Sequence, residues 1–366
     1  MNSLPKKQLP VRFLRFAQFI LAGWLIFAQS YAIPQHALGS SNKPLLSQVS
    51  QVNSKFEIGL PIDCTLGKDC HILAYIDQDP GPGFQDFGGG RQTYDGHDGT
   101  DFGITDEAAM KKGVAVKAAA SGVVVRVRDG VADKRVENPQ DAEKITNIGC
   151  GNAVVIDHPN QWRTYYCHLR NGSLTVKPGM RVEKGAVLGM VGSSGLASYP
   201  HVHFGVLHQG RKIDPFLGES LGESLGESTV KGGQPLWEET IAYVPTGLIN
   251  AGFSSQKTDI NAVWQGASST TSLTTKAAAI IFWVHPFGVI AGDVEHLRLI
   301  APDGKTVIES KAPIKTPNRI NRISLIGKRN TPEEPINAGT WKGEYQLRRN
   351  EKLLIDIKRE IEVTKS

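Results

Sequence analysis

Short apolar runs separated by glycine-rich turns fill the chain between residues 61 and 216. Runs rich in β-branched and aromatic residues and bounded by turn residues are typical of strands. A repeated K-x-G-x-x-V pattern, at Lys111 and again at Lys177, precedes two of these runs. Two similar β units folded on one another predict a small sandwich or barrel. The clearest predicted strands are 115–116, 123–125, 153–156, 164–167, 187–191 and 203–207.

A second block of β-like pattern runs from residue 237 to the end of the chain. It contains an apolar run at 279–284 and two hairpin patterns, 297–308 around Asp303-Gly304 and 341–357 around Asn350. This spacing predicts an immunoglobulin-like β-sandwich, so the whole chain is predicted to be all-β. Nothing in 237–366 has a catalytic pattern. We expect it to bind a polymer or a protein partner, or only to stabilise the chain.

Three segments of different composition divide the chain. Residues 33–60 are rich in Ser, Gln and Asn and predict a flexible lead-in. Residues 128–149 carry few apolar side chains and predict a long surface loop. The tetrapeptide Leu-Gly-Glu-Ser occurs three times in 217–228. Gly and Ser in every repeat predict a flexible linker, 217–236, between two domains.

The first 32 residues have the pattern of a signal peptide. Basic residues precede an apolar run at 16–27, and Ser30-Tyr31-Ala32 ends with small residues at the positions that a signal peptidase reads. Export to the periplasm, the cell envelope or the medium is therefore predicted, with a retained membrane anchor as the alternative. The basic residues are Lys6, Lys7, Arg12 and Arg15.

Charge and cysteine content follow from this export. The formal charge is +5, and removal of four signal-peptide cations leaves +1, which gives no reason to expect a nucleic-acid partner. Four cysteines in an exported chain predict two disulfides. Three pairings are open by count, and placement favours Cys64–Cys70 and Cys150–Cys167. A thiolate metal site is the weaker alternative, because the chain has no C-x-x-C pair.

Five residues in short, patterned contexts suggest metal chemistry: His97, Asp101, His168, His201 and His203. A period of two places the imidazoles of His201 and His203 on one face of a strand. Gly99 lets the backbone bend between His97 and Asp101. Nitrogen and carboxylate ligands without thiolate suit Zn²⁺, which acidifies water and polarises a carbonyl.

The alternative is that these residues are structural. A buried H-x-H pair would then need partners for both rings, which is costly. For the remaining histidines the structural interpretation is the favoured one: His36, His71, His158, His208, His285 and His296.

The ordered motifs resemble those of the lysostaphin-like, LytM-type zinc metallopeptidases. The similarity covers about 61–216 and includes 99–102, 151–154, 192–195 and Asp214-Pro215; Cys167, between Tyr166 and His168, is the one departure. The resemblance implies a compact, mostly antiparallel β domain with a groove across a sheet. It also implies zinc ligands His97, Asp101 and His203, and catalytic histidines His168 and His201.

The resemblance implies an exported zinc metalloendopeptidase that cuts the peptide stems or bridges of bacterial peptidoglycan and needs no organic cofactor. Tyr94 and Tyr199 are further candidates for lining the groove. Two alternatives stay open. One is a non-catalytic regulator of wall amidases, a class that loses metal ligands; the other is a secreted protease for glycine-rich proteins.

Overall fold

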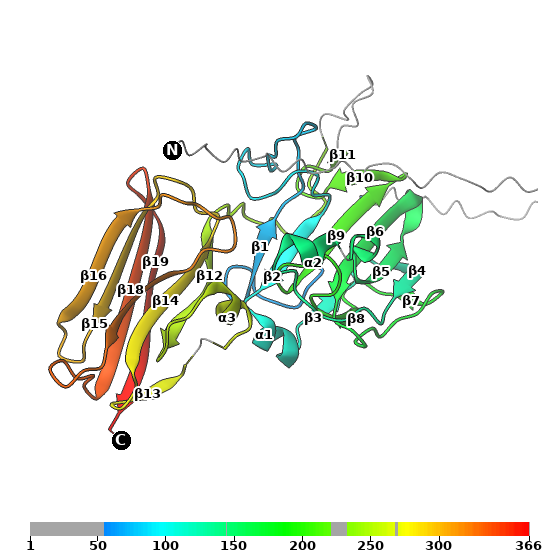
Figure 1. Cartoon of the computed structure of the whole chain (residues 1–366). Coiled ribbons are helices and arrows are strands. Elements are labelled where there is room, and N and C mark those ends of the chain that lie inside the picture. Colours follow the sequence, from blue (N-terminus) through cyan, green and yellow to red (C-terminus); the bar gives the residue numbers. More distant parts are fainter. Residues whose placement is uncertain (1–54, 144, 221–232, 268–269, 366) are drawn as a thin grey trace, which may run out of the picture. The chain divides into compact units, whose positions relative to one another are not determined.

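The computed structural model describes residues 55–143, 145–220, 233–267 and 270–365 (Figure 1). The predicted signal peptide, residues 33–54 of the predicted lead-in and positions 221–232 lie outside this range. The described chain is almost entirely β, as predicted, and residues 54–366 form one compact unit. None of its described helices is both long and apolar enough to cross a membrane.

One antiparallel sheet of nine strands organises the first domain, in the order β1-β2-β9-β6-β5-β4-β7, with β10 and β11 following at the side of β9. A separate antiparallel pair joins β3 to β8. The strands are β1 (Cys70–Ala74), β2 (Thr100–Ile104), β3 (Ala115–Lys117), β4 (Gly122–Arg128), β5 (Asn152–Asp157), β6 (Trp162–Leu169), β7 (Arg181–Val182), β8 (Val187–Met190), β9 (His201–His208), β10 (Arg211–Asp214) and β11 (Glu219–Ser220). The helices are α1 (Glu107–Lys112), α2 (Pro139–Glu143) and the 3₁₀ turns η1 (Thr146–Ile148) and η2 (Pro159–Gln161).

Side-chain alternation along these strands builds the core of the first domain. On β9, Val202, Phe204 and Val206 join that core, and His201 and His203 point to the other face, since successive residues of a strand alternate. Tyr166 of β6 pairs with Phe204 and is fully buried beside it. The apolar face thus holds the strands together and leaves the histidine face for chemistry.

The first domain extends beyond the predicted limits of 61 and 216. Ile58 is fully buried, and its N–H donates to Leu236 O over 2.9 Å. Glu238 N–H returns a bond of 2.9 Å to Ile58 O, and Trp237 packs in the same core. Residues 55–60 and 233–243 therefore complete the peptidase-like core.

Both described ends of the repeat region lie on this first domain. Ser220 pairs with Ile213 of β10, and Leu236 N–H donates to Pro215 O over 2.9 Å. Gly233 N–H donates to the Glu219 carboxylate. The described residues on both sides of 221–232 thus belong to the first domain, and the predicted linker 217–236 stays a prediction.

The second domain is a sandwich of two sheets, ordered β12-β14-β17 and β13-β19-β18-β15-β16. Both predicted hairpins are present, as β15–β16 and β18–β19, and β13 pairs with β19 in parallel. Residues of the two sheets share one core that includes Phe282, Trp341 and Tyr345. The elements are β12 (Gly247–Ser254), α3 (Ile260–Trp264), β13 (Ser272–Thr274), β14 (Ala279–Phe287), β15 (Val294–Ile300), β16 (Thr306–Pro313), β17 (Ser324–Arg329), β18 (Gly339–Arg349) and β19 (Lys352–Thr364).

A third apolar cluster joins the two domains. Leu73 and Tyr199 of the first domain pack with four side chains of the second, all six of them at least nine-tenths buried. The four side chains are Ile249, Trp264, Phe287 and Ile320.

The segment 128–149 is more structured than predicted. It contains α2 and η1, and Arg135 is buried within it. The Arg135 guanidinium pairs with Glu107 at 2.6 Å, and the Asp133 carboxylate accepts from Ser193 N–H at 2.9 Å. These polar anchors carry no apolar pattern, which explains why the segment reads as a loop.

Both favoured disulfides are present, Cys64–Cys70 and Cys150–Cys167. The second one joins the start of the β5 hairpin to β6, directly before His168. His168 N–H donates to Cys150 O over 2.9 Å, so the disulfide and this bond fix the same two chain segments. No cysteine within the described residues is free.

Asp214, at the end of β10, is a buried carboxyl that opposes folding when charged. Burial raises the pKa of Asp214 to about 7, and the nearby Asp86 and Glu219 carboxylates act in the same direction. Hydrogen bonds from Phe216 and Leu217 N–H lower this pKa and offset only part of the effect. A carboxyl whose pKa is higher in the folded state stabilises the fold below its unfolded pKa. That contribution is lost as the pH rises through the folded pKa.

Replacement by asparagine should remove this loss. We expect Asp214→Asn to raise the melting temperature above that of the wild type by several degrees at pH 8, and by less at pH 5. About 1 kcal/mol corresponds to about 2–4 °C in a domain of this size. Thermal unfolding followed by circular dichroism at both values measures it, with pH 5 as the internal control. An equal shift at both values would contradict the charge argument.

Candidate metal centre

Neighbouring strands bring two of the predicted ligands together. In the β2–β9 pair Asp101 lies opposite His203, and Gly103 lies opposite His201. Directly opposed residues have their Cβ atoms about 4.5–5.5 Å apart on the same face. The sheet register alone therefore places a carboxylate beside an imidazole.

His97 reaches the same point from the turn before β2. Its N–H donates to Tyr94 O over 3.0 Å, and Gly96 takes the left-handed backbone (φ 75°) that the turn requires. Gly99 is needed for space, because a Cβ there would lie 2.4 Å from His203 Nε2. The glycine thus lets the turn approach β9 closely.

Three ligand atoms converge. His97 Nε2 lies 3.0 Å from Asp101 Oδ1 and 3.2 Å from His203 Nδ1, and the last two atoms are 3.0 Å apart. Two ligand atoms on one tetrahedral zinc ion lie about 3.3 Å apart, given bonds of about 2.0–2.1 Å. These three buried residues therefore fit one metal ion. A second group, Cys64, Asp69 and Cys70, has its sulfurs in a disulfide.

Each ligand imidazole is fixed from behind. His97 Nδ1–H donates to Tyr75 O over 2.7 Å, which leaves Nε2 free for the metal. His203 Nε2 faces Asp98 Oδ1 at 3.3 Å, which leaves Nδ1 for it. Such outer partners orient the ring and raise the basicity of the ligand.

The two predicted catalytic histidines lie beside this group, with ring centres 4.6 Å apart. His201 Nδ1–H donates to Tyr199 O, and His168 Nδ1–H donates to Ser194 O, each over 2.8 Å. In both rings Nε2 stays available, and His201 Nε2 lies 3.6 Å from Asp101 Oδ1. The structure thus brings all five predicted residues together.

His168 owes its direction to an unusual backbone. Its φ is +63°, a left-handed value that costs a non-glycine residue energy and clusters at functional sites. The pairing of β6 with β9 ends one residue earlier, at Cys167 opposite His203. The left-handed turn sends the imidazole back toward His201.

Burial separates the charge states of the histidines. It lowers the pKa of His168 well below the usual range, helped by His201 and His203, and it also lowers the pKa of His201. Burial opposes charge on His203 too, but Asp101 and Asp98 raise its pKa to about 9. Neutral His168 and His201 are able to accept protons, and the carboxylates favour a cation at the ligand position.

Asp98 was not singled out from the sequence, and Tyr199 was expected to line the groove and not to support a ligand. Asp98 is bonded to His203 and lies 2.8 Å from Lys212 Nζ; its position directly after His97 was the available signal. Tyr199 is 2 % exposed, so it does not line an open groove; its O–H donates to Asp101 Oδ2 over 2.9 Å. Tyr94 is 46 % exposed and its ring packs on that of His97.

The other described histidines have separate environments. His158 bonds Ser121 O and Thr164, His285 bonds Ile320 O, and His296 pairs with Glu309. His208 stacks on Trp162. His36 lies outside the described residues.

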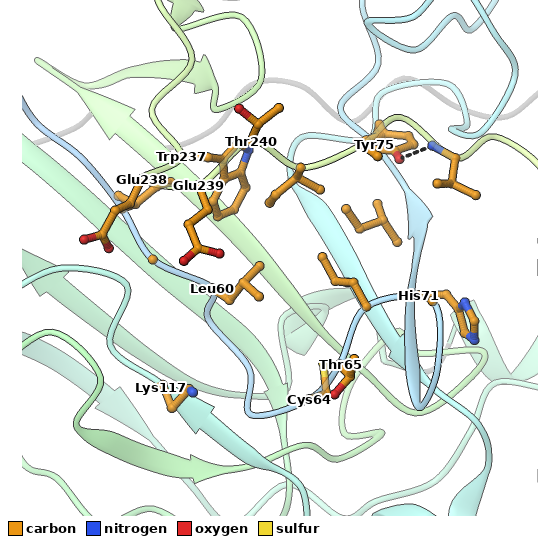
Figure 2. A pocket seen from close by; sticks show the side chains of 18 of the residues that line it. Leu60, Cys64, Thr65, His71, Tyr75, Lys117, Trp237, Glu238, Glu239 and Thr240 are labelled. Carbon is orange, nitrogen blue, oxygen red and sulfur yellow. Dashed lines mark hydrogen bonds between the residues drawn. The ribbon is translucent and has the colours of Figure 1, made fainter.

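His71 lines a cavity of about 680 Å³ (Figure 2). In Figure 2 Trp237, Glu238 and Glu239 lie at the upper left of the view and His71 at the right. None of the five predicted site residues lines it, so the cavity is separate from the metal centre.

Comparison with known proteins agrees with this geometry. The model of the family described as Peptidase family M23 matches residues 95–215, which include all five predicted residues. Residues 95–215 form an M23 peptidase domain. Cys167, the one departure from the family pattern, forms the disulfide directly before His168.

Similar proteins match a part of this chain. The peptidoglycan DD-endopeptidase ShyA of Vibrio cholerae is 33% identical over 118 residues, which are 32% of this chain and 22% of that protein. The DD-carboxypeptidase/endopeptidase Mpg of Neisseria meningitidis is 32% identical over 120 residues, with the same two shares. The catalytic domain of lysostaphin from Staphylococcus simulans is 25% identical, with 39% of this chain and 86% of that chain covered and a TM-score of 0.25. This chain therefore spans about a fifth of the length of its curated relatives.

The ligand geometry predicts which substitutions release metal. Asp101→Ala or His203→Ala should reduce bound metal from one ion per chain to a small fraction, because two donors remain. His168→Ala should keep it, because His168 is not among the converging donors. Elemental analysis after gel filtration measures the ratio. Full metal content in the Asp101 variant would refute this ligand set.

Proposed function

We propose that this protein is an exported zinc metalloendopeptidase that hydrolyses peptide bonds of bacterial peptidoglycan with zinc-activated water. One observation carries the proposal. A converging His97, Asp101 and His203 donor group lies beside two buried histidines whose Nδ1–H groups are already bonded. Three protein ligands are the number that a catalytic zinc site uses, with one position left for water.

Zinc is the metal that suits this donor set. Two imidazole nitrogens and one carboxylate oxygen without thiolate match catalytic zinc sites. When bound, zinc supplies an acidified water molecule and polarises the scissile carbonyl.

The remaining steps belong to the two histidines. His201, neutral because of burial, has its Nε2 near the ligand carboxylate and accepts the proton of the attacking water. His168, on the neighbouring strand β6, has its ring centre 4.6 Å from that of His201. The proton that His201 takes from water returns to the leaving amine directly or through His168, and His168 stabilises the oxyanion while it holds that proton. Both rings are held by backbone carbonyls, so neither needs to reorient.

The substrate class is proposed from the relatives. Relatives are named peptidoglycan DD-endopeptidase, DD-carboxypeptidase/endopeptidase and, for ALE-1 of Staphylococcus capitis, glycyl-glycine endopeptidase, so peptide stems or bridges of peptidoglycan are the proposed substrate here. A regulator that has lost its metal ligands is disfavoured, because all three ligands are present and converge. Export is proposed from the signal-peptide pattern and supported by two disulfides.

Digestion of defined substrates tests this function. The wild-type protein should convert cross-linked dimeric muropeptides into monomers, identified by mass spectrometry. His201→Ala and His168→Ala should keep bound zinc and lose about two orders of magnitude or more in rate, as is usual for a lost acid/base group. His296→Ala, which changes a half-buried ion-pair histidine of the sandwich, is the matched control and should keep full rate.

A parallel digestion separates the remaining alternative. An elastin-like polypeptide offers glycine-rich peptide bonds without any wall structure. If the protein cleaves that polypeptide and leaves the muropeptides uncut, glycine-rich proteins become the substrate and the peptidoglycan proposal is wrong. Zinc-loaded protein that cuts neither substrate would refute the peptidase proposal.

A further inference from the structure

The metal-ligand carboxylate of Asp101 is held on both of its oxygens. Oδ1 faces His97 and His203, and Oδ2 accepts the O–H of Tyr199 over 2.9 Å. The Tyr199 side chain is buried, so this hydrogen bond is shielded from water. The orientation of Asp101 therefore depends on where the Tyr199 ring lies.

That ring is placed by the second domain. Trp264, the last residue of α3, stacks on Tyr199 with ring centres 5.5 Å apart and planes 20° apart. Trp264 is 1 % exposed, and its indole N–H donates to Asn321 Oδ1 over 2.9 Å. The edge of His285, from β14, packs on it at 4.6 Å. Two parts of the sandwich therefore hold Trp264 in the position from which it stacks on Tyr199.

A second connection starts two residues from Asn321. The Arg319 guanidinium donates through Nη1 to Leu73 O at the β1 bulge, and lies 5.3 Å from the centre of the Tyr94 ring. Tyr94 in turn packs on the His97 ring at 4.5 Å. Within the described residues no carboxylate pairs with Arg319. The loop 318–321 therefore reaches the neighbours of a second metal ligand.

We propose that the C-terminal sandwich is an integral part of the metal centre, and that Trp264 and Arg319 are its positioning residues. Trp264 acts on Asp101 through Tyr199, and Arg319 acts on His97 through Tyr94. This inference rests on the proposed function only in taking zinc as the metal. It replaces the expectation from the sequence that a flexible linker separates two domains, with the sandwich outside the site.

A purely stabilising interface would have a different signature. It would lower the melting temperature of the variants and leave the affinity of the folded protein for zinc unchanged. Outer partners of metal ligands instead change affinity, typically by about 10- to 100-fold. Zinc affinity of folded protein, measured apart from hydrolysis, therefore distinguishes positioning from stability.

The test uses the full chain and a double-mutant cycle. Zinc affinity is measured by chelator competition for Trp264→Ala, Tyr199→Phe and the double variant. Tyr199→Phe removes only the hydroxyl, and should weaken binding about 10- to 100-fold. Trp264→Ala should weaken zinc binding similarly. The double variant should bind zinc about as tightly as the single variant with the lower affinity, because both changes act on the same hydrogen bond. Independent, additive losses would contradict action through Tyr199.

Trp341→Phe provides the control. Trp341 is buried in the sandwich core and contacts none of the site residues, so its variant should lose stability and keep zinc affinity. If Trp264→Ala does not fold, Trp264→Phe and Arg319→Gln take its place, with Arg319→Lys as the conservative partner. Lysine keeps the charge and loses the planar fork, so it should restore affinity only in part.

Cobalt substitution gives a readout of geometry. The visible absorption of the Co²⁺-loaded protein should change in band position or intensity in the Trp264 and Tyr199 variants and stay unchanged in the Trp341 control. Wild-type affinity and an unchanged cobalt spectrum in folded Trp264 and Arg319 variants would overturn the proposal. A wild-type protein that binds zinc and cleaves no muropeptide would refute only the proposed substrate.

Discussion

When β2 pairs with β9, Asp101 comes to lie opposite His203, so backbone hydrogen bonds set the distance between two metal ligands. A slip of one residue would send every side chain of β2 to the opposite face and place Asp101 in the apolar core. Phe102 and Ile104 of β2 resist that slip, because both would leave the core at the same time. Folding of the sheet and assembly of the site are therefore one event.

This arrangement concentrates one buried carboxylate among four imidazoles. A buried charge is costly unless it is paired and hydrogen-bonded. The protein meets that cost with Tyr199 on one oxygen and two ligand histidines on the other, and it fixes the outer nitrogen of three rings on backbone carbonyls. The surroundings are thus rigid on every side where the metal does not bind.

Local pattern was sufficient for much of this molecule. The H-x-H alternation, the H-x-x-x-D turn and the disulfide placement all depend on neighbours within a few residues, and the strands follow from period-two alternation. The left-handed backbone of His168 was not predictable, because histidine rarely adopts it. The contact of Trp264 with Tyr199 joins residues 65 positions apart in different domains, and no spacing rule reports such a pair.

The repeat region has a consequence for sequence change over generations. Tandem copies of a short coding unit gain and lose members easily during replication. Here the described ends of the region, Ser220 and Gly233, both belong to one domain, where Gly233 bonds Glu219. The metal ligands His97, Asp101 and His203 all lie outside the repeats. A change in the copy number of the Leu-Gly-Glu-Ser unit would therefore alter the chain between two fixed points of this domain without altering any ligand residue.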